Sequence, residues 1–177
     1  MKFLVLALVA VALVFGVKCV TIRKDLVSER RAIDADWAEV DAALVHRAGI
    51  VPELASAAQA EAPAEAGAIR AVGEARDALL SAGQSQGEKI KANGRLDEAL
   101  ARLMLQIENY PKLEGSKKYS DLLDALKDAE YRIAVARRKY NEAVEHYNAS
   151  IDLFPNNVVS SLTQLGKIDA YFKTPAI

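Results

Sequence analysis

One apolar stripe constrains the fold of this chain more than any other feature of its sequence. Between Tyr119 and Pro155, apolar residues recur at steps of three and four, the spacing of one face of an α-helix. The stripe consists of Tyr119, Leu122, Leu126, Ala129, Ile133, Ala136, Tyr140, Val144, Tyr147, Ile151 and Phe154. No Gly or Pro interrupts it, so we expect one helix roughly 54 Å long at 1.5 Å per residue. Such a helix is too long for the inside of a compact small domain and predicts an elongated antiparallel bundle.

The rest of the chain also has helical spacing, broken at a few points. A second stripe comprises Ile22, Leu26, Ile33, Trp37, Val40, Leu44, Val51, Leu54 and Ala58. Pro52 lacks a backbone donor, so a kink is expected near residue 48 rather than a stop. Residues 81–94 contain three Gly and predict a loop, and helical spacing returns from Arg95 to Tyr110. We therefore expect an all-α protein, with three or four antiparallel helices after its N-terminal segment.

Charge and cysteine content exclude two classes of function. After residue 20 the chain carries 21 basic and 24 acidic side chains. A mildly acidic domain is a poor nucleic-acid binder, because neutralising phosphates requires a basic face. Cys19 is the single cysteine, so neither an intrachain disulfide nor a cysteine metal site can form.

The N-terminus predicts a membrane anchor over residues 1–22. Phe3–Val17 carries no charge, and extension to Ile22 reaches the roughly 20 residues that a transmembrane helix needs. The alternative is a cleaved signal peptide, but Lys18 occupies a position where signal-peptide cleavage requires a small residue. Basic residues after the apolar run favour a bundle on the cytoplasmic side, with a periplasmic or extracellular bundle as the alternative.

No grouping of residues predicts catalysis or a bound cofactor. His46 and His146 lie on different expected helices, without acidic or cysteine companions at ligand spacing, so we expect no metal site. The chain has no nucleophile elbow and no phosphate-binding loop. We therefore expect a protein that is not an enzyme.

Polar and aromatic residues beside the stripes are the remaining candidates. Arg137, Asn141 and Asn148 flank the long stripe, and the two Asn share one face because they are seven residues apart. Asn is a mediocre helix former, so its presence needs a reason. We expect these side chains to bond internally and fix the register between helices, with a ridge for a partner as the alternative. Tyr140 and Tyr147 are expected to be core anchors whose hydroxyls find partners.

Several motifs resemble a known family. They are W-x-x-V-D-x-x-L-x-x-R from Trp37 to Arg47, V-P-x-L from Val51, and E-x-Y-P-x-L from Glu108. The most specific is E-x-x-I-x-x-x-R-x-x-Y-N-x-x-V-x-x-Y-N-x-x-I-x-x-F-P, which begins at Glu130 and ends at Pro155. In order and spacing, the chain resembles the LemA family of bacterial membrane-anchored helical proteins over about residues 20–173.

The resemblance implies a fold and a setting, but no established reaction. It implies one transmembrane helix (1–22), a helical bundle (23–157) and a C-terminal tail (158–177) with room for a short helix. Relatives are associated with membrane proteases of the HtpX type and with magnetosome membrane formation. We therefore expect a scaffold or adaptor in the bacterial cytoplasmic membrane, with an oligomer-forming or membrane-shaping protein as the alternative. The candidate structural or partner positions are Trp37, Asp41, Arg47, Arg137, Tyr140, Asn141, Tyr147 and Asn148.

Overall fold

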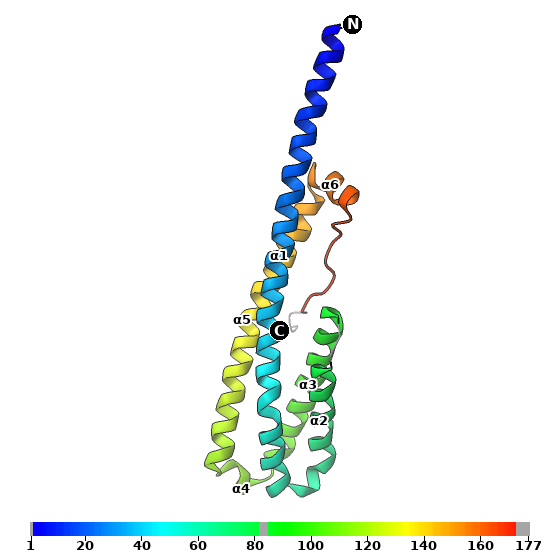
Figure 1. Ribbon diagram of the computed structural model, residues 1–177. Helices are drawn as coiled ribbons and strands as arrows, with labels where there is room; N and C mark the ends of the chain where they lie inside the picture. The colour runs from blue at the N-terminus through cyan, green and yellow to red at the C-terminus, as the bar shows by residue number, and fades with distance from the viewer. Residues whose placement is uncertain (1, 82–84, 173–177) are drawn as a thin grey trace. The chain divides into compact units, whose positions relative to one another are not determined.

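The computed structural model describes residues 2–81 and 85–172, apart from the side chains of residues 4–12, 14 and 114. Within these residues every regular element is a helix, which confirms the all-α prediction (Figure 1). The elements are α1 (Lys2–Glu61), the short 3-10 helix η1 (Pro63–Glu65), α2 (Ala66–Leu80), α3 (Gln86–Ile107), α4 (Pro111–Glu114), α5 (Lys117–Asp152) and α6 (Asn156–Thr163). They form two units, and α1 and α5 contribute to both: unit 1 is Met1–Asp36 with Tyr140–Asp169, and unit 2 is Trp37–Lys139 with Ala170–Ile177.

Unit 2 is an antiparallel bundle of four helical segments. Its members are the second part of α1, α2, α3 and the first part of α5 (Figure 1). Consecutive segments run in opposite directions, as short connections require. The core consists of stripe residues that are less than a tenth exposed, among them Val40, Leu44, Leu96, Leu103 and Ile133.

Unit 1 pairs the first part of α1 with the second part of α5, which run antiparallel. The Ser150 hydroxyl donates to Glu29 over 3.2 Å, and the Arg30 guanidinium donates to the Gly166 carbonyl over 3.4 Å. α6 and the tail that follows it complete this unit. Leu26, at 1% exposed, is the first fully buried residue along the described part of α1.

The long stripe becomes the buried face of α5, with one exception. Ten of its eleven members, from Tyr119 to Ile151, are at most 9% exposed. Phe154 is 77% exposed, so its expected place in the core is wrong. The reason is that α5 ends at Asp152, and the helical spacing that would turn Phe154 inward does not continue past that residue.

The expected loop over residues 81–94 is too long. α3 already begins at Gln86, so Gly87 and Gly94 lie inside a helix; residues 82–84 are outside the described part of the chain. Ser85 and Glu88 form a capping box at the start of α3. The Glu88 backbone N–H donates to the Ser85 hydroxyl, and the Ser85 backbone N–H donates to the Glu88 carboxylate over 2.8 Å. These bonds satisfy N–H groups at the helix end and outweigh the low helix propensity of the two glycines.

The expected membrane anchor falls largely on residues 4–12 and 14, whose side chains are outside the described part of the structure. Over the residues that the structure describes, no helix has the length and apolarity needed to cross a membrane.

Candidate functional site

The most buried polar group of unit 2 is Arg47, which is fully buried on α1. Its Nη1 donates to the Asp97 carboxylate over 2.5 Å and also to the Glu130 carboxylate, and its Nη2 donates to the Asn93 side-chain oxygen over 2.7 Å. Asn93 in turn donates to Asp97 over 3.0 Å. One guanidinium therefore joins α1, α3 and α5. We call these four residues the Arg47 cluster.

Helical spacing explains why these side chains meet. Arg47 lies three residues after Leu44 and four before Val51, so it occupies a position of the α1 stripe. Asn93 likewise lies three residues before Leu96, on the buried face of α3. Two polar residues at core positions of neighbouring helices are expected to hydrogen-bond to each other, because burying a polar group without a partner costs free energy.

The Arg47 cluster combines a buried guanidinium with carboxylates that are partly exposed to solvent. Arg47 is completely shielded, whereas the side chains of Asp97 and Glu130 are 41% and 47% exposed. Arg47 Nε is buried and lacks a hydrogen-bond partner in the described part of the chain. The geometry suits a register-fixing contact, since the carboxylates remain hydrated while the guanidinium holds three helices at one level.

Other ion pairs and hydrogen bonds of unit 2 support the same arrangement. Asp41, a candidate position, accepts from Lys89 and joins α1 to α3. The Tyr110 hydroxyl donates to Glu65 over 3.0 Å. This hydrogen bond raises the pKa of Tyr110, and partial desolvation and the charge of Glu65 act in the same direction.

In unit 1, the side chain of Asn148 forms hydrogen bonds with the backbone of the C-terminal tail. Its side-chain nitrogen donates to the Ile168 carbonyl over 2.8 Å, and its side-chain oxygen accepts from the Ile168 N–H over 2.9 Å. The hydroxyl of Tyr147 donates to the Gly166 carbonyl over 3.4 Å. Tyr147 is fully buried, as the sequence suggested for a core anchor. Both residues therefore bind the tail of their own chain.

In unit 2, Trp37 and Arg137 enclose a second tail residue, Phe172. The Trp37 and Phe172 rings are stacked with centroids 6.0 Å apart and planes 24° apart. The guanidinium carbon of Arg137 lies 4.6 Å from the Phe172 ring centroid, a cation–π geometry. Phe172 is only 4% exposed, so this sandwich removes an aromatic side chain of the tail from water.

The remaining candidates on α5 are a core residue and a flanking residue. Tyr140 is fully buried, and Asn141 beside it is half-buried. His46 and His146 are both exposed. Among the described residues, no group of three or more His, Cys, Asp or Glu side chains is placed to hold a metal ion.

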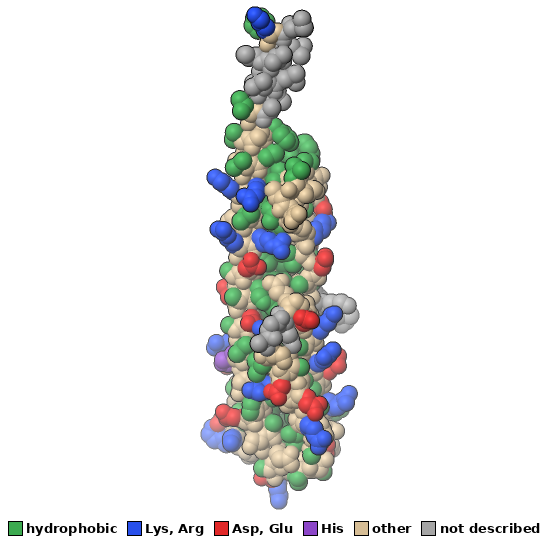
Figure 2. Space-filling view, turned by 45° about the vertical axis from the view of Figure 1, so that its right-hand side comes forward, with side chains coloured by type: hydrophobic (Ala, Val, Ile, Leu, Met, Phe, Trp, Pro, Cys, Tyr) green, Lys and Arg blue, Asp and Glu red, His purple; other side chains and the backbone are tan. Residues whose placement is uncertain are grey.

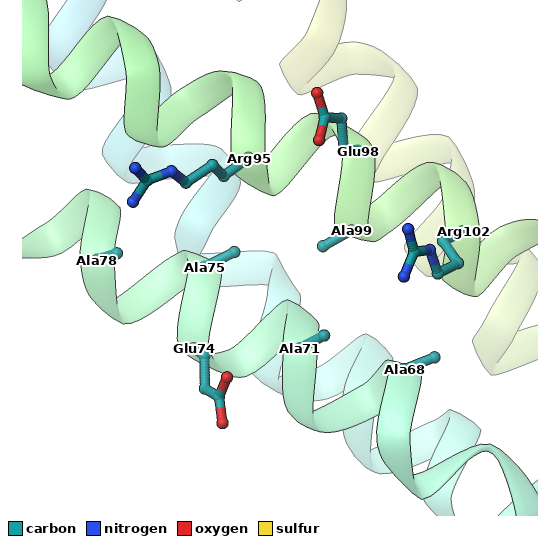
Figure 3. Close-up of a pocket in the computed structure, with 9 residues that line it drawn as sticks. All are labelled: Ala68, Ala71, Glu74, Ala75, Ala78, Arg95, Glu98, Ala99 and Arg102. Carbon is teal, nitrogen blue, oxygen red and sulfur yellow. The ribbon is translucent and has the colours of Figure 1, made fainter.

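A shallow groove of about 350 Å³ lies between α2 and α3 in unit 2. Its lining is Ala68, Ala71, Glu74, Ala75, Ala78, Arg95, Glu98, Ala99 and Arg102. Figure 3 shows the alanines of α2 facing Ala99 of α3, with Arg95 and Arg102 reaching into the space between the helices and Glu74 and Glu98 directed away from it. The groove thus has a floor of methyl groups and two guanidinium groups at its edge.

The sequence predicted Arg47 and Trp37 as candidate positions, but it did not predict their partners. Asn93 and Asp97 are partners of Arg47, and Phe172 is the partner of Trp37. The signal for Asn93 was available, because a polar residue occupies a core position of the helical spacing that continues to Leu96. No local signal identifies Phe172, since its partners lie on helices far away in the sequence.

The fold defines an all-α, helical-bundle protein whose buried polar side chains tie helices and tail together. The chain matches the LemA family over residues 36–176 and belongs to that family. It is 30% identical over 98 residues to the magnetosome protein MamQ of Magnetospirillum gryphiswaldense, covering 55% of this chain and 36% of that protein. It is 33% identical over 85 residues to the magnetosome proteins MamQ 1 and MamQ 2 of Paramagnetospirillum magneticum, covering 48% of this chain and 31% of each. The matching part thus spans about a third of the curated relatives' length.

Proposed function

We propose that the chain is a non-enzymatic, membrane-anchored scaffold or adaptor, with residues 3–22 as its anchor. One observation carries the proposal: large apolar side chains at the N-terminal end of α1 are exposed. Leu13 is 66%, Phe15 47%, Val17 68% and Val20 56% exposed. At 100° per residue Leu13, Val17 and Val20 lie on one side of the helix and Phe15 lies on the opposite side. A helix that is apolar all round needs an apolar surrounding, which a bilayer supplies.

The adaptor role rests on how the rest of α1 is used. The same helix supplies Arg47 to the cluster that joins three helices of unit 2. Its partners would be membrane proteins, and a membrane protease of the HtpX type is the candidate we favour. Exposed apolar side chains on other helices, such as Leu105 at 66% and Tyr131 at 72%, are available for contacts with such a partner.

Photocrosslinking in intact membranes tests this role. A photoreactive residue in place of Leu105 or Tyr131 should form adducts with other membrane proteins, identified by mass spectrometry. The same residue in place of Ile133, which is 1% exposed, should form none. Absence of adducts from both exposed positions, together with a monomer in mild detergent, would contradict the proposal.

We further propose that the bundle faces the cytoplasm, because Lys18, Arg23, Lys24, Arg30 and Arg31 follow the apolar run. Protease added to intact spheroplasts should leave the bundle uncut and digest it once the cells are broken. Digestion from outside would place it in the periplasm or beyond the cell, the alternative that the sequence leaves open.

The second candidate function is an oligomer-forming or membrane-shaping protein. The groove between α2 and α3 favours it, since small side chains permit close helix approach and Arg95 and Arg102 suit an acidic helix face of another copy. That three curated relatives are named magnetosome proteins supports it further.

Sizing of the detergent-solubilised chain decides between the two candidates. If copies associate through the groove, the double variant Arg95→Glu/Arg102→Glu should shift the chain to the monomer. Arg132→Glu, an exposed residue outside the groove, should leave the assembly unchanged. A wild-type chain that is already monomeric rejects the alternative.

A further inference from the structure

Unit 1 has an exposed apolar patch on α6 and in the turn before it. It consists of Leu153 and Phe154, in the turn that follows α5, and of Val158 and Leu162 on α6. These side chains are 64%, 77%, 37% and 76% exposed. We call these four residues the α6 patch. Val158 and Leu162 are four residues apart and share one face of α6, while Val159 and Ser160 form its buried face.

The α6 patch lies at the end of unit 1 from which the N-terminal part of α1 extends. α5 runs antiparallel to α1, and Ser150 contacts Glu29, so the residues after Ser150 lie level with earlier parts of α1. Figure 1 shows the turn between α5 and α6 beside α1, on the side towards the N-terminus. Along α1, exposure falls from 56% at Val20 to 1% at Leu26, a distance of about 9 Å at 1.5 Å per residue.

Basic side chains outnumber acidic ones along α1 at this level. Between residues 18 and 31 the chain has five basic and two acidic side chains. Lys18, Arg23, Lys24 and Arg31 are exposed. Figure 2 shows hydrophobic side chains gathered in the upper part of the view, with Lys and Arg side chains next to them. An apolar face bordered by cations is the composition of a surface that enters the headgroup region of an anionic bilayer.

We propose that the α6 patch is a second membrane contact, inserted at the interface of an anionic bilayer beside the anchor. The inference rests on the proposed anchor, because residues 3–22 in the bilayer would bring Leu153 and Phe154 to its surface. Phe154 and Leu162 enter the boundary between headgroups and acyl chains, while Arg23 and Lys24 meet lipid phosphates. The contact holds unit 1 at the membrane surface at a second point besides the anchor.

Depth-dependent quenching tests the contact in the full-length chain. The chain, with Cys19→Ser, is reconstituted into vesicles of phosphatidylglycerol and phosphatidylcholine. An environment-sensitive fluorophore is attached at Phe154→Cys, Leu162→Cys, Leu13→Cys or Glu145→Cys. Glu145 is the matched control, because it is exposed on α5 in the same unit, more than two turns from the patch. Circular dichroism of each variant checks that the helices are retained.

The proposal expects probes at 154 and 162 to emit at shorter wavelength and to be quenched by lipids with a nitroxide near the headgroup. The probe at 145 should remain aqueous, and the probe at 13 should be quenched by a nitroxide deep in the acyl chains. If the probe at 13 is quenched but those at 154 and 162 are aqueous, the inference is wrong and the anchor stands. If the probe at 13 is aqueous, the anchor fails and the inference fails with it.

Two further outcomes would overturn the proposal that the α6 patch binds an anionic bilayer. Blue-shifted emission at 154 and 162 without quenching by lipid nitroxides would mean that protein, not lipid, covers the α6 patch. Equal quenching in purely zwitterionic vesicles would remove the role assigned to Arg23 and Lys24. Stronger quenching in anionic vesicles supports it.

Discussion

Arg47 stands at a position of the α1 stripe where the neighbouring turns carry Leu44 and Val51. A buried guanidinium there is stable only because Asn93, Asp97 and Glu130 supply acceptors from two other helices. Replacing Arg47 by Ala leaves a cavity and removes the partner of the buried Asn93. We expect a loss of about 3 kcal/mol in the free energy of unfolding, at the low end for buried pairs because both carboxylates remain partly hydrated.

Urea unfolding of the detergent-solubilised chain, followed by circular dichroism, measures this loss. Arg47→Lys should lose part of it, since an ammonium cannot reproduce the planar fork. Arg95→Ala, an exposed arginine on α3, should change the free energy of unfolding by at most about 0.5 kcal/mol. Equal values for Arg47→Ala and Arg95→Ala would show that the Arg47 cluster does not stabilise the fold.

The hydrogen bond between Asn148 and Ile168 leads to a prediction about the tail. Its amide accepts from the Ile168 N–H, so Asn148→Ala should speed hydrogen exchange at that amide by about tenfold, the equivalent of one lost hydrogen bond. Asn157→Ala, an exposed asparagine on α6, is the control and should leave exchange at Ile168 unchanged. The same rate at Ile168 in wild type and Asn148→Ala would mean that another contact holds the tail.

These residue-scale contacts show which part of the site the sequence predicts. Helical spacing singles out Arg137, Asn141 and Asn148 as polar residues beside an apolar face, and it favours internal bonding for them. It does not supply their partners, because Asn148 meets Ile168 and Arg137 meets Phe172 only when the tail has returned to the helices. The cross-helix polar layer lies at Arg47 and Asn93, where three helices meet.

At the scale of elements, the long helix and the all-α class follow from apolar spacing, while boundaries depend on local chemistry. Residues 85–94 have a loop-like composition, yet the Ser85 capping box starts α3 there. Phe154 fits the stripe, yet α5 ends before it. Spacing therefore predicts which face is buried, and capping and proline decide where each helix stops.

The stabilisation that the capping box gives to α3 is expected to depend on pH. Hydrogen bonds from the Ser85 backbone and hydroxyl hold the pKa of Glu88 below its ordinary value of 4.5. The folded state therefore favours the carboxylate, so this stabilisation is present above pH 4.5 and is lost as the pH falls through the folded pKa. Ser85→Ala should destabilise the start of α3 by about 1 kcal/mol.

Carboxyl NMR titration measures the same interaction directly. In Ser85→Ala the pKa of Glu88 should rise towards its ordinary value. A pKa of Glu88 that is the same in wild type and Ser85→Ala would contradict the capping account.

At the scale of the whole molecule, family membership and bundle construction agree, and the membrane role is the proposal that connects them. Buried contacts such as the Arg47 cluster and the Trp37–Phe172 stack serve the fold itself. Exposed apolar side chains at the start of α1 and in the α6 patch do not. A bilayer would account for both exposed sets at once, since both lie in unit 1.

Alkaline carbonate extraction of membranes that contain the full chain tests this claim most directly. Wild type should stay in the membrane pellet, and so should Val45→Arg, which alters an exposed apolar residue of unit 2. Leu13→Arg/Val17→Arg should be released, because an arginine costs about 3 kcal/mol near the centre of a spanning helix, where Leu13 lies. Release of the wild-type chain by carbonate would contradict a membrane anchor at residues 3–22.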